Sequence, residues 1–208
     1  MDLILNADAV VLGDAQPGPE HTVFFNTGAH VEGSTDPAEE EFAFPPIPIP
    51  PVTSAGPYSL GNFGTDTLGP GLLGFDDFTL NKGSHLTIKG PATLVVGNFL
   101  AGKDGRMTVD TADGPVTFYV QGDYTHLANY EIQAASGTAV AVAFMVQGTG
   151  DVVFPASGKI RGAYYVPNAD VLFSNNCEAW GSFAANRIEM ASAMNFHYDE
   201  SLAKHWEV

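Results

Sequence analysis

A short apolar tile recurs five times between Leu94 and Ala185, and this recurrence constrains the fold more than any other feature. Successive copies start 24, 26, 20 and 19 residues apart. Repetition at about 20–25 residues is typical of repeat architectures, in which each unit buries its apolar face against the next unit. The copies are Leu94-Val95-Val96, Phe118-Tyr119-Val120, Phe144-Met145-Val146, Tyr164-Tyr165-Val166 and Phe183-Ala184-Ala185.

Side chains alternate between the two faces of a strand, so stacked tiles predict two inward columns and one outward stripe. The first inward column contains Leu94, Phe118, Phe144, Tyr164 and Phe183. The second contains Val96, Val120, Val146, Val166 and Ala185. The outward stripe, Val95, Tyr119, Met145, Tyr165 and Ala184, is either a binding surface for sugar rings or protein, or is covered by residues 35–78.

Further short apolar runs, each closed by Gly, Asn or Asp, lie between the tiles, which gives about three short strands per period. These features predict an all-β fold, a right-handed parallel β-helix with one period of about 20–25 residues per coil. Its coils would stack at the strand spacing of about 4.8 Å. The alternative is an antiparallel sandwich, whose strands usually recur every 8–12 residues or so and need no longer echo.

The pattern also suggests four segments. Residues 1–34 form the first coils, because a bend followed by an outgoing strand begins at Asn6 and Asn26 and returns at Asn81 and Asn168. The main solenoid spans residues 79–190. Residues 191–208 form a C-terminal cap over the last coil, since an open coil exposes core and unpaired backbone. The cap residues are Phe196, His197, Tyr198, Asp199 and Trp206.

Residues 35–78 break the pattern as an acidic and Pro/Gly-rich excursion packed on the outside of the coils. Proline lacks the backbone N–H donor, so the run from Phe44 to Val52 cannot join a strand ladder and is expected to be extended. Ile47 and Ile49 would hold it against the solenoid. A loop of this length is uncommon and is usually functional or loosely ordered.

Charge excludes several partners. The chain has 8 Lys and Arg against 24 Asp and Glu, a net charge of −16, which disfavours nucleic acid and anionic membranes. An acidic surface is compatible with Ca²⁺ or a basic protein partner, although no cofactor is required. Cys177 is the only cysteine, so no intrachain disulfide forms. No apolar run is long enough for a membrane span, and residues 1–3 are no signal peptide, so export would require a targeting segment outside this chain.

Four phrases carry a family resemblance: residues 114–123, 162–171, 180–183 and the closing Phe-His-Tyr-Asp-Glu-Ser-Leu at 196–202. Together they resemble a bacterial β-helix domain of unknown function found in PilX-like pilus-assembly and other surface proteins. The resemblance covers residues 1–202 and implies an extracellular or cell-surface role without established catalytic residues. The architecture is also similar to that of bactofilins, β-helical proteins that polymerise end to end.

Two groups of residues are candidates for chemistry. His197, Asp199 and Glu200 have the ligand types of a transition-metal site, but the same side chains could instead cap the backbone of the last coil. A polysaccharide lyase would combine Ca²⁺-binding aspartates near turns, such as Asp77, Asp104 and Asp123, with a basic proton acceptor. The basic candidates are Arg106, Lys159, Arg161 and Arg187.

No nucleophile elbow, phosphate loop or dinucleotide fingerprint occurs in the sequence. We therefore expect a non-enzymatic structural or adhesive surface module, either pilus-associated or self-assembling into filaments through its ends. The alternative is a polysaccharide-binding or lyase-type β-helix protein.

Overall fold

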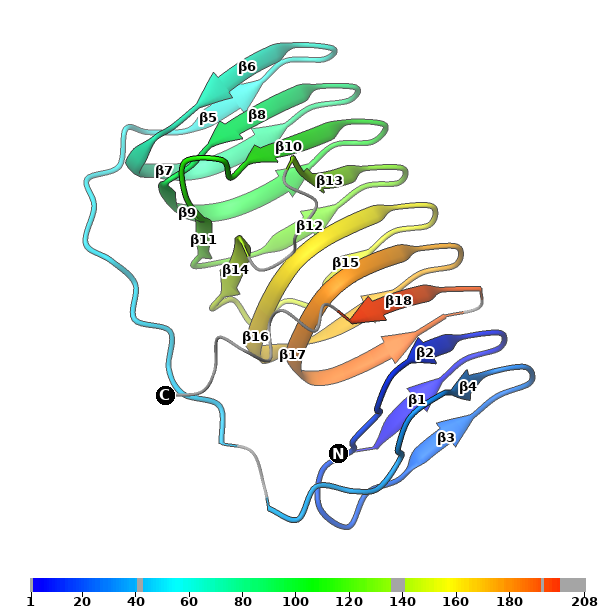
Figure 1. The fold of residues 1–208 in the computed structure, drawn as a ribbon. Coiled ribbons are helices and arrows are strands. Elements are labelled where there is room, and N and C mark those ends of the chain that lie inside the picture. Colours follow the sequence, from blue (N-terminus) through cyan, green and yellow to red (C-terminus); the bar gives the residue numbers. More distant parts are fainter. Residues whose placement is uncertain (1, 41–42, 136–140, 192, 199–208) are drawn as a thin grey trace.

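The computed structural model describes residues 2–40, 43–135, 141–191 and 193–198. Within these ranges there is no helix, and every strand belongs to one parallel, right-handed β-solenoid of about nine turns (Figure 1). Each complete coil has three faces, which the chain visits in the order face 1, face 2, face 3. The predicted fold class is thus confirmed, and the antiparallel alternative is excluded because every strand pairing is parallel.

Face 1 carries the tiles. From the end labelled β6 in Figure 1, here called the upper end, it contains parts of β7 (Gly71–Leu80) and β9 (Ala92–Ala101), then β11 (Val116–Val120), β14 (Val142–Val146), and parts of β16 (Lys159–Phe173) and β17 (Glu178–Met190).

Faces 2 and 3 extend beyond face 1 at both ends of the stack. Face 2 contains β5 (Tyr58–Leu60), the ends of β7 and β9, β12 (Tyr124–His126), β15 (Val152–Phe154), the ends of β16 and β17, β1 (Leu3–Leu5) and β3 (Val23–Phe25). Face 3 contains β6 (Thr65–Leu68), β8 (His85–Lys89), β10 (Arg106–Asp110), β13 (Glu131–Ala134), the starts of β16 and β17, β18 (Asn195–Tyr198), β2 (Val10–Leu12) and β4 (His30–Val31).

The interior is a set of ring stacks along the axis. Phe118 lies over Phe144, Phe144 over Tyr164 and Tyr164 over Phe183, with ring centroids 4.7, 4.6 and 4.8 Å apart. A second stack on face 2 joins Tyr58, Phe78, Phe99 and Tyr124. Because side chains on neighbouring strands point the same way, the rings inside each stack, such as Phe144 and Phe99, are covered on both faces by the rings above and below them.

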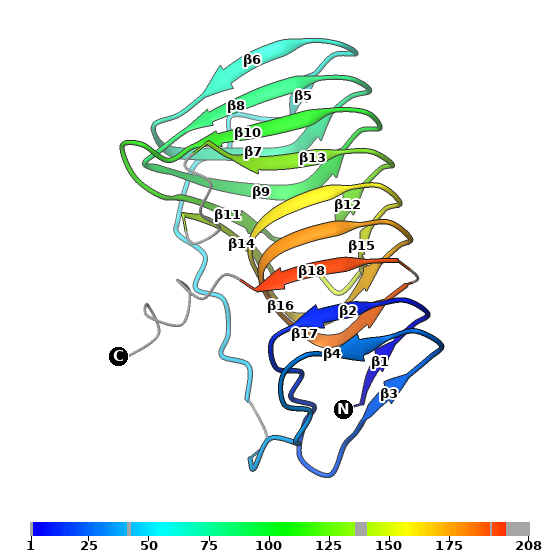
Figure 2. The ribbon, with the colours of Figure 1, turned by 45° about the vertical axis from the view of Figure 1, so that its right-hand side comes forward.

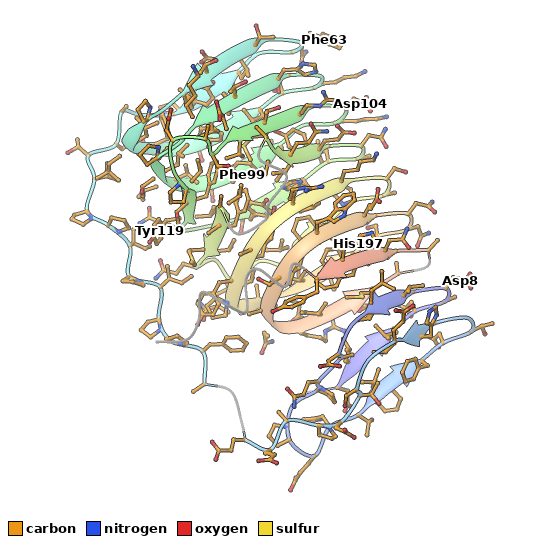
Figure 3. The ribbon with its side chains drawn as sticks, viewed as in Figure 1. Asp8, Phe63, Phe99, Asp104, Tyr119 and His197 are labelled. Atoms are coloured by element: carbon orange, nitrogen blue, oxygen red, sulfur yellow. The ribbon has the colours of Figure 1, made fainter. Side chains whose placement is uncertain are left out.

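A column of tight turns joins face 2 to face 3. The third residue of every turn has a positive φ, between 56° and 79°, and six of the turns close with a hydrogen bond from the fourth residue to the first. This combination is typical of type II turns, where Gly or Asn usually takes the third position. The nine residues are Asp8, Gly28, Phe63, Gly83, Asp104, Asn129, Ser157, Asn176 and Ala193 (three are labelled in Figure 3).

The order of the coils in space differs from the order in the sequence. The N-terminal strands lie at the lower end, where β1 pairs with β17 and β2 pairs with β18 (Figure 1). The chain then runs along the outside to the upper end, starts again at β5 and winds down to β18 (Figure 2). Residues 1–34 are therefore coils, but they are the last coils of the stack and not the first.

Two predicted boundaries change accordingly, and one copy of the bend phrase has another position than expected. Residues 58–78 form β5, β6 and most of β7, so the excursion outside the solenoid is shorter than residues 35–78. Residues 195–198 form β18 between β17 and β2, so this part of the expected cap is an interior rung. Asp199, Glu200 and Trp206 lie outside the described residues. The Asn168 copy of the bend phrase lies within β16, at the corner between faces 1 and 2, and not in the turn column.

Candidate functional surfaces

His197, the described member of the expected metal cluster, belongs to an axial stack on face 3 (Figure 3). Its ring stacks on Trp180 with centroids 5.2 Å apart, and the Arg161 guanidinium lies over the Trp180 ring at 4.9 Å. Glu178 Oε1 lies 3.9 Å from His197 Nε2. Because both faces of the Trp180 ring are covered, this ring offers no free face for stacking against a sugar.

The described residues contain no group of three or more His, Cys, Asp or Glu side chains that could hold a metal ion. His30 and His85 occupy the same position on face 3, but they lie near opposite ends of the solenoid, on β4 and β8. Sequence equivalence therefore does not bring these two imidazoles together.

Two of the basic residues that a lyase would need, Arg106 and Arg187, form ion pairs between neighbouring strands, and Lys159 lies in register with two glutamates. Strand register places Arg106 beside Glu131, Glu131 beside Lys159, and Lys159 beside Glu178. The Arg106–Glu131 ion pair measures 3.0 Å. Arg187 on face 2 contacts Asp170 at 2.9 Å and Glu189 at 3.1 Å. Alternating charges across strands favour one register, which is a structural role.

Carboxylates line the corner between faces 1 and 2. Asn98 donates a hydrogen bond to Asp77 at 2.9 Å and accepts one from the Asp123 backbone at 3.0 Å. The register of β12, β15 and β16 places Asp151 between Asp123 and Asp170. Of the aspartates that the sequence singled out, Asp77 and Asp123 belong to this column, and Asp104 belongs to the turn column.

Sequence reasoning missed Asp151 and Asp170. They follow their tiles by five and four residues, whereas Asp123 follows its tile by three, so only the strand register aligns them. Like charges on neighbouring strands repel, so this column of carboxylates lowers the stability of the fold locally. Arg187 offsets part of this repulsion at one end of the column. Nothing else in the described residues marks the column as an ion site.

The outward stripe on face 1 is partly covered by residues 43–57, here called the strap (Figure 2). Phe44 packs on Tyr165 with ring centroids 5.8 Å apart, and the Tyr165 hydroxyl donates to the Pro45 carbonyl. Ile47 is buried, as the sequence suggested for a residue holding the strap. Tyr119 points toward this side of the molecule (Figure 3).

A pocket of about 470 Å³ lies between the strap and face 1. Phe75 and Val95 supply apolar surface, and Ser54, Asp76 and Gln121 supply polar groups. The Phe75 ring itself points inward, where it packs on Tyr58 and Phe78, so the pocket offers a sugar polar groups and aliphatic surface.

A polar cluster lies inside the stack, where Tyr124 and His126 from face 2 meet Tyr164 from face 1. His126 Nε2 is hydrogen-bonded to the Tyr124 hydroxyl at 2.6 Å, and Tyr124 donates to Tyr164 at 3.3 Å. Burial lowers the pKa of His126 to about 3, so the imidazole is neutral, and burial raises the pKa of Tyr124. His126 Nδ1, Tyr130 Oη and Ser84 Oγ are buried without a hydrogen-bond partner. The cluster is sealed from solvent.

The two ends of the solenoid have opposite chemistry. At the upper end, Asp66 stands on β6 where the next rung carries Leu86, and the Tyr58 hydroxyl donates to its carboxylate at 2.8 Å. At the lower end, Phe24 and Phe25 on β3 remain 53% and 48% exposed. Val31 on β4 is half-buried, so this end leaves core columns open.

Residues 50–205 match a family model described as a domain of unknown function, DUF7305. The chain belongs to this family. No curated protein and no solved structure matches the chain significantly. The described ranges contain no helix with the length and apolar character that a membrane span requires.

The matched range of DUF7305 includes the upper end and every coil from β5 to β18. Strands β1 to β4, which form the open lower end, precede it. The relation to PilX-like proteins or to bactofilins stays a prediction.

Proposed function

We propose that this DUF7305 protein is a non-enzymatic structural or adhesive module at the cell surface, associated with pili or similar appendages. One observation carries the proposal. The cations and rings that an enzyme or lectin would direct at a ligand are used in axial ladders that join one rung to the next. Arg106 and Lys159 alternate with Glu131 and Glu178, and Trp180 is enclosed between Arg161 and His197.

A surface role also suits the geometry of the ends. Strands β1 and β18 are both near the lower end, so an attachment at either side of the folded region would hold the rod there (Figure 1). The upper end, with Asp66 and the exposed Phe63, would then point away from the attachment.

The proposal is tested by locating the protein on intact cells of its source with an antibody, before and after surface proteolysis. We expect surface labelling that protease removes, and loss of attachment or appendage assembly when the gene is deleted. Labelling only after cell lysis would contradict the surface role.

The second candidate is polysaccharide binding, favoured by the polar groups of Ser54, Asp76 and Gln121 in the pocket beneath the strap. A glycan array with the wild-type protein and the Gln121→Ala variant tests it. Lyase activity would be seen as ultraviolet absorbance of unsaturated products with Ca²⁺ present. Turnover that Arg106→Ala or Lys159→Ala abolishes would overturn the non-enzymatic proposal.

A further inference from the structure

The lower end exposes two strands whose outer edges have no partner among the described residues. Strand β3 pairs with β1, and β4 pairs with β2, on one side each. Their inward residues Val23, Phe25 and Val31 continue core columns that have no next rung. An open edge with apolar inward residues is the arrangement that pairs with another chain.

The upper end of the same chain does not complement this surface. On face 3, the inward position passes through apolar residues from Leu86 down to Val31, but at the top it is Asp66. Continuing the stack head to tail would place Val31 of one copy on Asp66 of the next. Burying that carboxylate against an aliphatic side chain without a cation is unfavourable, so this charge blunts the upper end.

The lower end, in contrast, complements itself. Strands β3 and β4 form two sides of a V that meet at the turn of residues 26–29. A two-fold axis along the bisector of this V exchanges its sides, so β3 of one copy lies antiparallel to β4 of the other. Inward residues then meet inward residues, and the interface closes on itself.

We propose that two copies of this protein join through their lower ends in a two-fold pair, and that the upper ends stay free. This inference rests on the proposed structural role and names its partner as a second copy. The rods carry a net charge of −16 each, so added salt should strengthen the pair by screening their repulsion. The interface lies in the coils that precede the range matched by the DUF7305 model.

The mass of the full chain in solution tests the proposal, measured by sedimentation over a range of concentration and salt. We expect a dimer, with Phe25→Glu weakening association by at least about tenfold, as for a central apolar interface residue. Phe63→Glu is the matched control, because Phe63 is a more exposed aromatic residue at the opposite end and should leave the dimer intact. Circular dichroism and thermal unfolding verify that both variants are folded.

Crosslinking distinguishes the two-fold pair from a head-to-tail chain. Thr27 lies at the tip of the lower turn, near the proposed axis, so Thr27→Cys should form an intermolecular disulfide with its own copy. A head-to-tail contact would instead require Thr27→Cys together with Asn62→Cys at the upper tip. Cys177 is buried and does not compete.

Two outcomes would overturn the inference. The first is a monomer at all concentrations and salts. The second is fibre formation by the wild-type protein together with crosslinking that occurs only when Thr27→Cys and Asn62→Cys are combined. A monomer that still labels the cell surface would refute the pairing while leaving the proposed function intact. Enzymatic turnover by a dimer would support the pairing and refute the proposed non-enzymatic function.

Discussion

The coils that match DUF7305 and the two coils that precede the match are built differently, although both belong to one stack. Between the upper end and β17, each coil has strands on three faces and an aromatic interior. The N-terminal coils have strands on two faces only, and residues 13–22, which contain two prolines, replace the third. Their buried side chains are aliphatic, among them Leu5, Ala9 and Val11, and their inward aromatic residue, Phe25, is 48% exposed. Because these coils lack the aromatic stacks of the main solenoid, most of their buried apolar surface is covered by the neighbouring coil.

The N-terminal coils also complete the stack across the longest sequence distance in the molecule. Asn6 lies beside Glu189, 183 residues away, and β2 pairs with β18. We expect these contacts to form late in folding, because the edge that β1 and β2 pair with is supplied by β17 and β18 at the other end of the chain. We therefore expect the two regions to differ in stability as well as in construction.

The largest expected effect is the loss of a central ring. Phe144→Ala removes a side chain stacked between Phe118 and Tyr164 and should cost about 3–5 kcal/mol of unfolding free energy, as for other buried aromatic residues. Phe25→Ala, in the lowest coil, should cost less than about 1 kcal/mol at protein concentrations where the chain is monomeric, because its ring is then half exposed. Urea unfolding measures both, and equal losses would remove the distinction between the two regions.

The next effect is a pH dependence that belongs to the interior. The pKa of His126 is about 3 in the folded state and 6.5 in the unfolded chain, so between these values the unfolded state binds more protons. Above about pH 6.5 the imidazole is neutral in both states and does not reduce the free energy of unfolding. Below it, the free energy of unfolding should fall, by about 2–3 kcal/mol near pH 4.5, because the unfolded state binds a proton that the folded state does not.

The difference in slope between wild type and His126→Phe in urea unfolding at several pH values isolates this contribution. Parallel curves for the two proteins would show that the imidazole is not held neutral in the core.

Gly28→Ala should destabilise the N-terminal coils by about 1–2 kcal/mol, the cost of a left-handed conformation with a Cβ. Gly28 has a φ of 79°, and an added Cβ would lie 2.1 Å from Asp8 Oδ1. Hydrogen exchange should accelerate in β1 to β4 and remain unchanged in β11 and β14. Uniform acceleration along the chain would mean that the two regions unfold as one unit.

The smallest effect is a gain. Asp151→Asn removes one of three carboxylates on neighbouring rungs of the matched solenoid and should stabilise it by about 0.2–1 kcal/mol. The gain should shrink as salt screens the column. Asp36→Asn is the control outside the column, and thermal unfolding at low and high salt measures both. Destabilisation by Asp151→Asn would show that this carboxylate has a favourable partner.

The tile recurrence was enough to predict the fold class and the inward columns, because strand alternation and stacking are local consequences of the period. The strap was also foreseeable from its prolines. The polar cluster was not, since Tyr124, His126 and Tyr164 lie on rungs whose alignment depends on loop lengths. The same limit applies to the alignment of Asp151 and Asp170. It also applies to the phrase at Asn168, which has a sequence like the turns between faces 2 and 3 but lies at the corner between faces 1 and 2.

By itself, the sequence determined the coil: its period, its apolar columns and the bends at Asn6, Asn26 and Asn81. Only the tertiary structure decided which coil follows which. A parallel edge accepts any rung with apolar inward residues, so stacking order depends on which edges remain open. The N-terminal coils occupy the open edge below β17 and β18, whereas Asp66 blunts the edge above β6. A pattern read along the chain cannot distinguish these two edges.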